Sequence, residues 1–234
     1  MYSEAMTARA GRAAARAERR ERVRKRNEPP VLTAGEERFN ALSHGAGAVL
    51  AAAAAAALLM KAGSGLAVTA AWVYGASMTM MMLMSAVYHA LPAGSRAKRI
   101  CRRFDYTSIY LLIGGTFAPI FLVYLGNRLG VALFCCQWAV ILGGVVLLLI
   151  FGPGKWRALH FTLYFLIGWS GLVFLPDFYR NSRTLLWFIL WGGVVYTLGM
   201  IPFARGKRYD HCVWHVFVLA AAALHWVGIY TQIY

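Results

Sequence analysis

The chain has 234 residues, of which 60% are hydrophobic and only 14% are charged, and its mean hydropathy is +0.55. These values exclude a soluble globular domain and predict a polytopic membrane protein. The formal net charge of +15 at pH 7 comes largely from segments that flank apolar runs, so it does not indicate nucleic-acid binding. The four cysteines form no CxxC pair, so neither a disulfide framework nor a thiolate zinc site is indicated.

Residues 1–35 are predicted to form a separate basic segment on the cytosolic side of the membrane. Arginine recurs from Arg9 to Arg26 among alanine and glutamate, and Pro29 and Pro30 close this stretch. It is too charged for the apolar region of a signal peptide. Its composition suits either a helix that lies on anionic lipid headgroups or a solvated tail, and we favour a mobile tail.

Seven apolar segments follow within residues 36–234, and each has close to the roughly 20 residues that a helix needs to cross the hydrocarbon core. They lie at about 41–60, 66–91, 104–125, 129–151, 157–176, 184–203 and 209–232. Stretches rich in alanine and glycine within them permit the close helix contacts that are common in lipid. We therefore predict an all-α transmembrane domain of seven helices.

Basic residues are abundant in every second connection between the predicted spans. The basic connections are residues 93–103, 152–157 and 204–208, and the others carry one or two basic residues each. Short connections rich in lysine and arginine stay in the cytosol. The N-terminus is therefore predicted to be cytosolic and the C-terminus to lie outside.

His211 and His215 lie four residues apart on the last predicted span. This spacing places both imidazoles on one helix face, where they can reach a single divalent metal ion. His89 lies near the cytosolic end of the second span and Asp105 at the cytosolic start of the third. The alternative is that the histidine pair is an ordinary polar feature of a helix end. Ionisable residues within spans are costly and are functional candidates by default, which favours the metal site.

Asp105 is expected to be the only acidic residue inside the membrane domain. Most of the nine acidic residues, including Glu36 and Glu37, precede the first predicted span, while Asp177 lies in an outer connection and Asp210 at the rim. Three neutral imidazoles and a water molecule form a zinc site suited to catalysis. A carboxylate at that site can orient the water, accept its proton or supply an outer hydrogen bond.

Ser85 lies one helical turn before His89 and is a further candidate at the same centre, although a serine in a membrane helix more often bonds its own backbone. His44 and His160 also begin spans on the cytosolic side, so depth alone leaves them open as ligands. His225 lies ten residues after His215, about 15 Å further along the helix. It is predicted to be packed or to hydrogen-bond between helices.

Short motifs also occur in a fixed order from residue 36 onward. They include Glu36-Glu37-Arg38-Phe39-Asn40, Ser43-His44-Gly45, Ser85-Ala86-Val87-Tyr88-His89, Asp105, Gly115-Thr116-Phe117-Ala118-Pro119, Tyr196-Thr197-Leu198-Gly199 and His211-Cys212-Val213-Trp214-His215. In this order they resemble the haemolysin III proteins, the bacterial branch of the progestin and adipoQ receptor family. The ordered pattern over several spans is far more specific than any single motif.

The resemblance implies a seven-helix protein of the bacterial inner (plasma) membrane with its N-terminus inside. It also implies a zinc ion bound by His89, His211 and His215, with Asp105 and Ser85 at the same centre. It favours these three histidines over the two alternatives that depth left open.

Two positions depart from the family pattern. Tyr106 stands where a histidine is common, and Ala118 stands where a threonine is usual. Both positions concern the surroundings of the site and leave the ligand set unchanged. The basic segment lies outside the resemblance.

Three classes of function follow for such a protein. A membrane metallohydrolase would cleave a lipid amide, such as a ceramide-like substrate, because an activated water beside a carboxylate suits attack on an acyl carbonyl that arrives laterally. A non-enzymatic receptor-like or membrane-regulating protein would use a structural zinc and sense membrane lipid or acyl chains. A pore-forming cytolysin fits worst, because a lytic pore needs a secreted soluble form or a polar lumen. The sequence leaves the substrate and the oligomeric state open.

Overall fold

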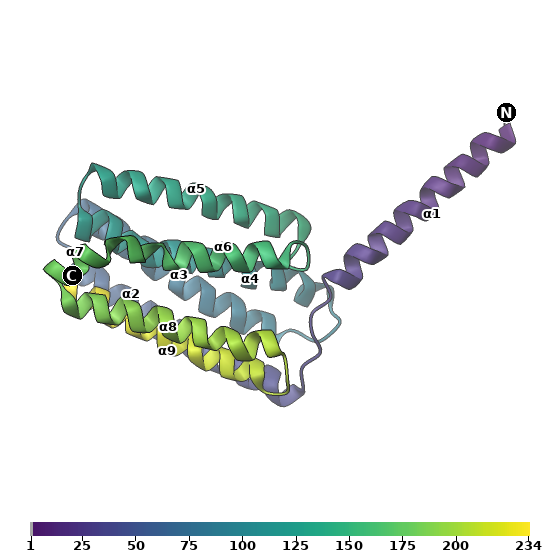
Figure 1. Ribbon diagram of the computed structural model, residues 1–234. Coiled ribbons are helices and arrows are strands. Elements are labelled where there is room, and N and C mark those ends of the chain that lie inside the picture. The colour runs from purple at the N-terminus through teal and green to yellow at the C-terminus, as the bar shows by residue number, and fades with distance from the viewer. Residues whose placement is uncertain (1) are drawn as a thin grey trace.

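The computed structural model describes residues 2–234, and it describes side chains for Arg9 and residues 11–234. The elements are α1 (Tyr2–Arg26), α2 (Ala34–Lys61), α3 (Gly65–Ala90), α4 (Arg96–Pro119), η1 (Ile120–Leu125), α5 (Arg128–Phe151), α6 (Arg157–Trp169), η2 (Ser170–Phe174), α7 (Leu175–Asn181), α8 (Arg183–Arg205) and α9 (Asp210–Gln232). No strand occurs among the residues that the structure describes. Figure 1 shows the helices α2 to α9 as one bundle, from which α1 projects at one end.

Seven helical stretches are long and apolar enough to cross a membrane, which confirms the predicted seven-helix fold. They are α2, α3, α4 with η1, α5, α6 with η2 and α7, α8, and α9. An odd number of spans places the two ends of the bundle's chain at opposite faces, and the three basic connections share the end from which α1 projects (Figure 1). Which of these faces the cytosol stays a prediction from the charge pattern.

Two spans begin earlier than predicted, because polar residues cap and start their helices. Thr33 and Glu36 form a reciprocal capping box that begins α2 at Ala34, and the Ser95 side chain accepts a hydrogen bond from the backbone N–H of Lys98 at the start of α4. The predicted connection at 93–103 is therefore wrong in extent, and most of its basic residues lie on the first turns of α4. For the same reason Glu36 and Glu37, which were predicted to precede the first span, lie on its helix.

Helix packing brings the N-terminal halves of α4 and α9 close to the C-terminal end of α3. The helices α2, α3 and α4 pack in succession, and α9 packs against both α2 and α8. Glycine makes two of these contacts possible: a Cβ at Gly115 on α4 would clash with the Ser77 side chain on α3, and one at Gly199 on α8 would lie 2.6 Å from Cβ of Phe217 on α9. The close approach of these helices sets the distances within the site described below.

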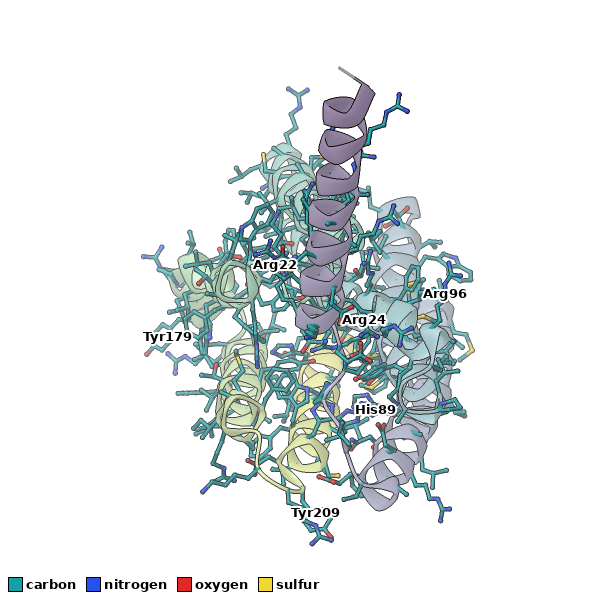
Figure 2. The ribbon with its side chains drawn as sticks, turned by 90° about the vertical axis from the view of Figure 1, so that its right-hand side faces the viewer. Arg22, Arg24, His89, Arg96, Tyr179 and Tyr209 are labelled. Atoms are coloured by element: carbon teal, nitrogen blue, oxygen red, sulfur yellow. The ribbon has the colours of Figure 1, made fainter. Side chains whose placement is uncertain are left out.

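The basic segment contains one helix, α1, which is rich in alanine and carries exposed ion pairs between residues three or four apart, such as Arg24 with Glu21. Arg22 and Arg24 lie along α1 outside the bundle, whereas His89 lies among the bundle helices (Figure 2). Asn27 joins α1 to the bundle: its Nδ2 donates to the carbonyl of Phe151 at 3.1 Å. The mobility of α1 and its contact with lipid stay predictions.

Candidate metal centre

His89, His211 and His215 converge at the end of the bundle nearest α1. Each offers one ring nitrogen, and these three atoms lie within 4.8 Å of one another. The three ring centroids are 4.8 to 5.0 Å apart, and Nε2 of His211 lies 3.1 Å from Nε2 of His89. Zinc–nitrogen bonds of 2.0–2.1 Å in a tetrahedral site separate the ligand nitrogens by roughly 3.3 Å. The separation of His89 and His211 is therefore close to that of two zinc ligands, and the ring nitrogen of His215 lies near enough to reach the same ion.

The turn between α8 and α9 fixes the position of the two histidines of α9. Tyr209 adopts the left-handed backbone conformation, with φ of 65°, and its N–H donates to Oε1 of Glu36 at 2.7 Å. The buried Asp210 accepts hydrogen bonds from the Arg205 guanidinium and from the backbone N–H of Lys207. These bonds hold the first turn of α9 against the first turn of α2, so the histidine pair faces the end of α3.

Glu37 orients His89, a role that the sequence pattern did not predict. Oε2 of Glu37 lies 2.7 Å from Nδ1 of His89. A carboxylate can only accept a hydrogen bond, so Nδ1 carries the proton and Nε2 presents its lone pair to the other two histidines. The expectation that Asp105 is the only acid inside the domain is therefore wrong. The signal was present in the sequence, because a Thr-x-x-Glu capping box marks a helix start just before Glu37.

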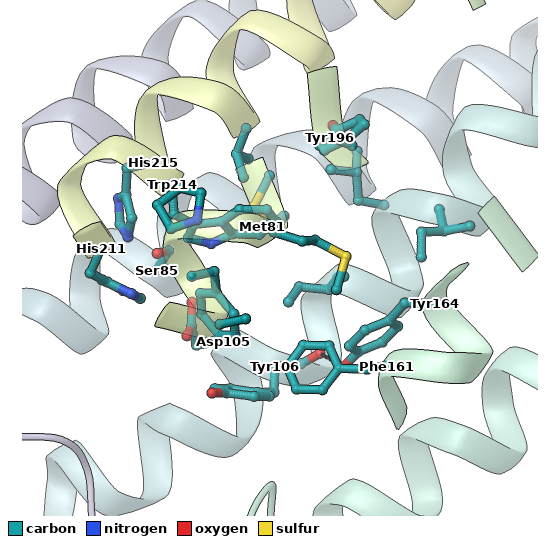
Figure 3. Close-up of a pocket in the computed structure, with 18 of the residues that line it drawn as sticks. Met81, Ser85, Asp105, Tyr106, Phe161, Tyr164, Tyr196, His211, Trp214 and His215 are labelled. Atoms are coloured by element: carbon teal, nitrogen blue, oxygen red, sulfur yellow. Dashed lines mark hydrogen bonds between the residues drawn. The ribbon is translucent and has the colours of Figure 1, made fainter. Parts of the chain in front are cut away.

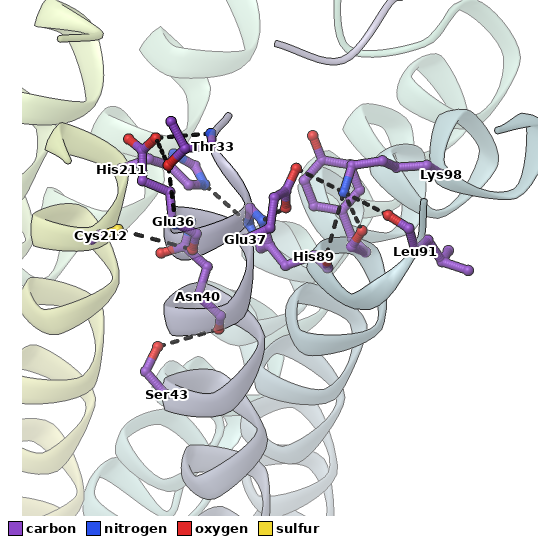
Figure 4. Close-up of polar contacts among 11 residues, drawn as sticks. Thr33, Glu36, Glu37, Asn40, Ser43, His89, Leu91, Lys98, His211 and Cys212 are labelled. Atoms are coloured by element: carbon purple, nitrogen blue, oxygen red, sulfur yellow. Dashed lines mark hydrogen bonds and ion pairs between the residues drawn. The ribbon is translucent and has the colours of Figure 1, made fainter. Parts of the chain in front are cut away.

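Lys98 completes this contact from α4. Its side chain is 1% exposed, and Nζ lies 3.0 Å from Oε1 of Glu37. The ammonium also donates to the carbonyls of Tyr88 at 2.9 Å and Leu91 at 3.1 Å, so a buried cation has found acceptors for its protons (Figure 4). This lysine was predicted to lie in a connection and to act on topology, whereas it ties α4 to α2 and to the end of α3.

Asp105 and Ser85 line the same cavity as His211 and His215, and their roles stay predictions. Ser85 is buried on α3, and Asp105 on α4 lines the same cavity. Figure 3 shows both pointing into the space that His211 and His215 also face. Asp105 is partly exposed to this space. Asp105 is therefore placed to act on a molecule in the cavity. It is not one of the candidate metal ligands, which are all imidazoles.

The other three histidines occupy different surroundings. His44 stacks on His215 with 3.7 Å between ring centroids, but it is not part of the ligand group. Nδ1 of His160 lies 3.0 Å from the hydroxyl of Tyr110, outside the site. Nε2 of His225 donates to the carbonyl of Ile189 at 3.1 Å, which confirms the predicted interhelical hydrogen bond. Tertiary packing thus separates residues that depth alone left equivalent.

A cavity of about 560 Å³ extends from the histidines into the bundle. Its size is within the range of small-molecule binding sites. Side chains of α3, α4, α6, α8 and α9 line it, and beyond the polar centre most of them are apolar or aromatic, among them Met81, Phe161, Tyr164, Tyr196 and Trp214 (Figure 3). The site therefore combines a polar end with an apolar interior, as an amphiphilic ligand requires.

The donor set at this centre fits a metal ion of the zinc type. Neutral imidazoles suit zinc and several other first-row metals, and a carboxylate on the second ring nitrogen is a common feature of such ligands. A direct hydrogen bond between His89 and His211 would also explain their 3.1 Å separation. Such a hydrogen bond does not explain why the buried imidazole of His215 lies as close to His89 as that of His211 does. Nδ1 of His215 also has no hydrogen-bond partner among the described residues.

Comparison with known proteins gives consistent matches over most of the chain. A family model described as "Haemolysin-III related" matches residues 32–226. Hemolysin-3 of Bacillus cereus is 32% identical over 194 residues, which cover 81% of this chain and 88% of that protein. The Hemolysin-3 homolog of Bacillus subtilis (strain 168) is 30% identical over 198 residues, with 82% and 92% covered. The human Monocyte to macrophage differentiation factor is 25% identical over 170 residues, 70% of each chain.

Proposed function

This chain belongs to the haemolysin III family and is a multi-pass protein of the bacterial plasma membrane, and we propose that it hydrolyses lipid amides with a bound zinc ion. Its role would be in membrane lipid homeostasis. The observation that carries this proposal is the position of Asp105. Its carboxylate lies beside three converging imidazoles, at the polar end of an apolar cavity within the bundle.

His89, His211 and His215 would hold the metal. A zinc ion bound there would supply an activated water as a nucleophile at neutral pH. Asp105 is placed to accept a proton from a water at the centre and to return it to the leaving amine, the work of a general acid–base. Ser85 lines the same end of the cavity, where its hydroxyl can donate a hydrogen bond to the substrate carbonyl.

The cavity supplies the remaining requirements. Its apolar walls accept an acyl chain and exclude bulk water from the polar end. An acyl chain that lies along α9 would place its amide carbonyl near His211 and His215, in the first two turns of that helix. The cytolysin alternative is not supported by these features, because the interior is apolar and not a polar lumen.

A second candidate is a receptor-like protein with a structural metal, and one observation favours it. Glu37, Lys98 and the histidines together link α2, α3, α4 and α9 at one end of the bundle. A metal at this junction would stabilise the helix arrangement even without turnover. Lipid occupancy of the cavity would then be sensed and not consumed.

One variant separates the two candidates. Asp105→Asn keeps the shape and leaves the imidazoles in place, so metal content and thermal stability should be retained. We expect release of fatty acid from a panel of N-acyl lipids in proteoliposomes to fall about a hundredfold or more if Asp105 is the general base. Asp177→Asn on α7, far from the site, is the matched control and should keep full release.

The outcomes are distinct. Undiminished release from fully metal-loaded Asp105→Asn protein would overturn the catalytic role. If neither the wild type nor the control releases fatty acid from any N-acyl lipid, the structural candidate replaces the hydrolase. Lipid analysis of a deletion strain complemented with each variant tests the same distinction in cells.

A further inference from the structure

One end of the cavity is lined by cationic side chains from four separate segments. Arg26 comes from the end of α1, Arg102 from α4, Arg157 from the start of α6, and Lys207 from the connection between α8 and α9. None of them forms an ion pair with a described acidic residue. Glu28 also lines this end, but its carboxylate lies 3.6 Å from Arg99. The four cations therefore outnumber the described carboxylates that line the cavity, Glu28 and Asp105, so this end keeps an excess of positive charge.

Neutral groups hold two of these cations in place. Nη1 of Arg102 donates to the carbonyls of Asn27 at 3.1 Å and Glu28 at 2.9 Å, and its Nε is buried without an acceptor among the described residues. The Arg157 guanidinium lies over the rings of Phe161 and Phe203, at 5.3 and 5.9 Å from their centroids. Both guanidinium groups are thus positioned while they keep their charge available to a ligand.

The cavity is long as well as polar at one end. His211 and His225 both line it, and 14 residues of α9 separate them, or about 21 Å along the helix. This length exceeds half of the roughly 30 Å hydrocarbon core, which is the share of one lipid leaflet. The sequence of surfaces from one end to the other is cationic, then imidazole and carboxylate, then apolar.

Abundant lysine and arginine at one face of a membrane protein have a general explanation in topology. That explanation does not require them to line a cavity. Lys155 and Arg208 lie within two residues of Arg157 and Lys207 in the sequence, yet neither lines the cavity. The two pairs therefore separate a topological role from a binding role.

We propose that the cavity binds a single-chain lipid with an anionic headgroup, a phosphate or a carboxylate, which lies between Arg102, Arg157 and Lys207 while the chain extends towards His225. Guanidinium groups suit such headgroups because they can donate two parallel hydrogen bonds. This inference rests on the proposed function, because it names the substrate class of the proposed hydrolase as N-acyl lipids with an anionic headgroup. Binding itself requires no turnover.

The test compares headgroups on one chain length. Hexadecyl phosphate, hexadecanol and inorganic phosphate are titrated into detergent-solubilised full-length protein, and bound molecules are counted by native mass spectrometry. We expect hexadecyl phosphate to bind at least about tenfold more tightly than hexadecanol. Each of Arg157→Gln and Lys207→Gln should reduce this preference about fivefold, because one basic residue near a membrane surface contributes about that much to the binding of anionic lipid.

Lys155→Gln and Arg208→Gln are the matched controls and should keep the preference. Equal binding of hexadecyl phosphate and hexadecanol to the wild type, or an equal loss in controls and cavity variants, would overturn the proposal. Inorganic phosphate that binds as tightly as hexadecyl phosphate would also overturn it, because the chain would then contribute nothing. The same titration on Asp105→Asn protein keeps the result independent of hydrolysis: the preference should persist there even if the hydrolase proposal fails.

Discussion

Oε2 of Glu37 lies 2.7 Å from Nδ1 of His89, a contact between the first turn of α2 and the last turn of α3. The two residues are 52 positions apart in the sequence. The contact fixes the tautomer of His89 and turns its Nε2 towards the two histidines of α9. The geometry of the candidate metal centre therefore depends on a residue that is not one of its three proposed ligands.

Glu37→Gln should weaken metal binding. The amide can still accept a hydrogen bond but no longer polarises the imidazole, and such outer changes reduce metal affinity roughly tenfold to a hundredfold. Competition with a chromogenic chelator measures the affinity. Glu28→Gln, which removes a carboxylate that pairs with Arg99 away from the histidines, should leave it unchanged. Equal affinities for Glu37→Gln and the wild type would show that the contact does not support the metal.

Lys98→Met should destabilise the fold. The ammonium is buried against Glu37 and two backbone carbonyls, and removal of one member of a buried ion pair typically costs about 3 kcal/mol or more. Thermal unfolding in detergent measures the loss. Arg96→Met on the exposed face of the same helix turn is the control, with an expected change below about 0.5 kcal/mol. A similar unfolding temperature for the two variants would contradict the structural role of Lys98.

Substitution of the histidines should reveal the ligand set. His89→Ala, His211→Ala and His215→Ala each remove one of three converging nitrogens and should lower the metal content of purified protein, measured by elemental analysis. His160→Ala, which loses a contact to Tyr110 elsewhere, should retain one ion per chain. Full metal content in all three ligand variants would end the hypothesis of a metal centre here.

A reporter placed at each end of the bundle should establish the orientation. A fusion after Tyr234 is expected to be active outside the cell, and one inserted at Gly94, in the short connection between α3 and α4, inside. The reason is the excess of basic residues at the end of the bundle that carries α1. A C-terminus that reacts only with cytosolic reagents would reverse the orientation and place the metal centre near the outer surface.

The sequence by itself was sufficient for the number of spans and for naming the residues that the structure places together at the candidate site. A long apolar run identifies a membrane-spanning helix whatever the other helices are, because each helix must satisfy its own backbone hydrogen bonds in lipid. The pairing of His211 with His215 is likewise local, since residues four apart share a helix face. His89, Asp105 and Ser85 were placed by their depth and by the family resemblance, and the structure brings all five residues together.

Tertiary structure alone decided which other charged residues belong to the site. Hydropathy places Glu37 ahead of the first predicted span and Lys98 in a connection, because polar first turns lie outside an apolar window even when they continue the same helix. Lys98 is buried and Glu37 half-buried because α2, α3 and α4 pack against one another and supply each charge with a partner. The cavity and its cationic end have the same origin: their residues come from segments that only the folded bundle places side by side, and no local pattern in the sequence records that proximity.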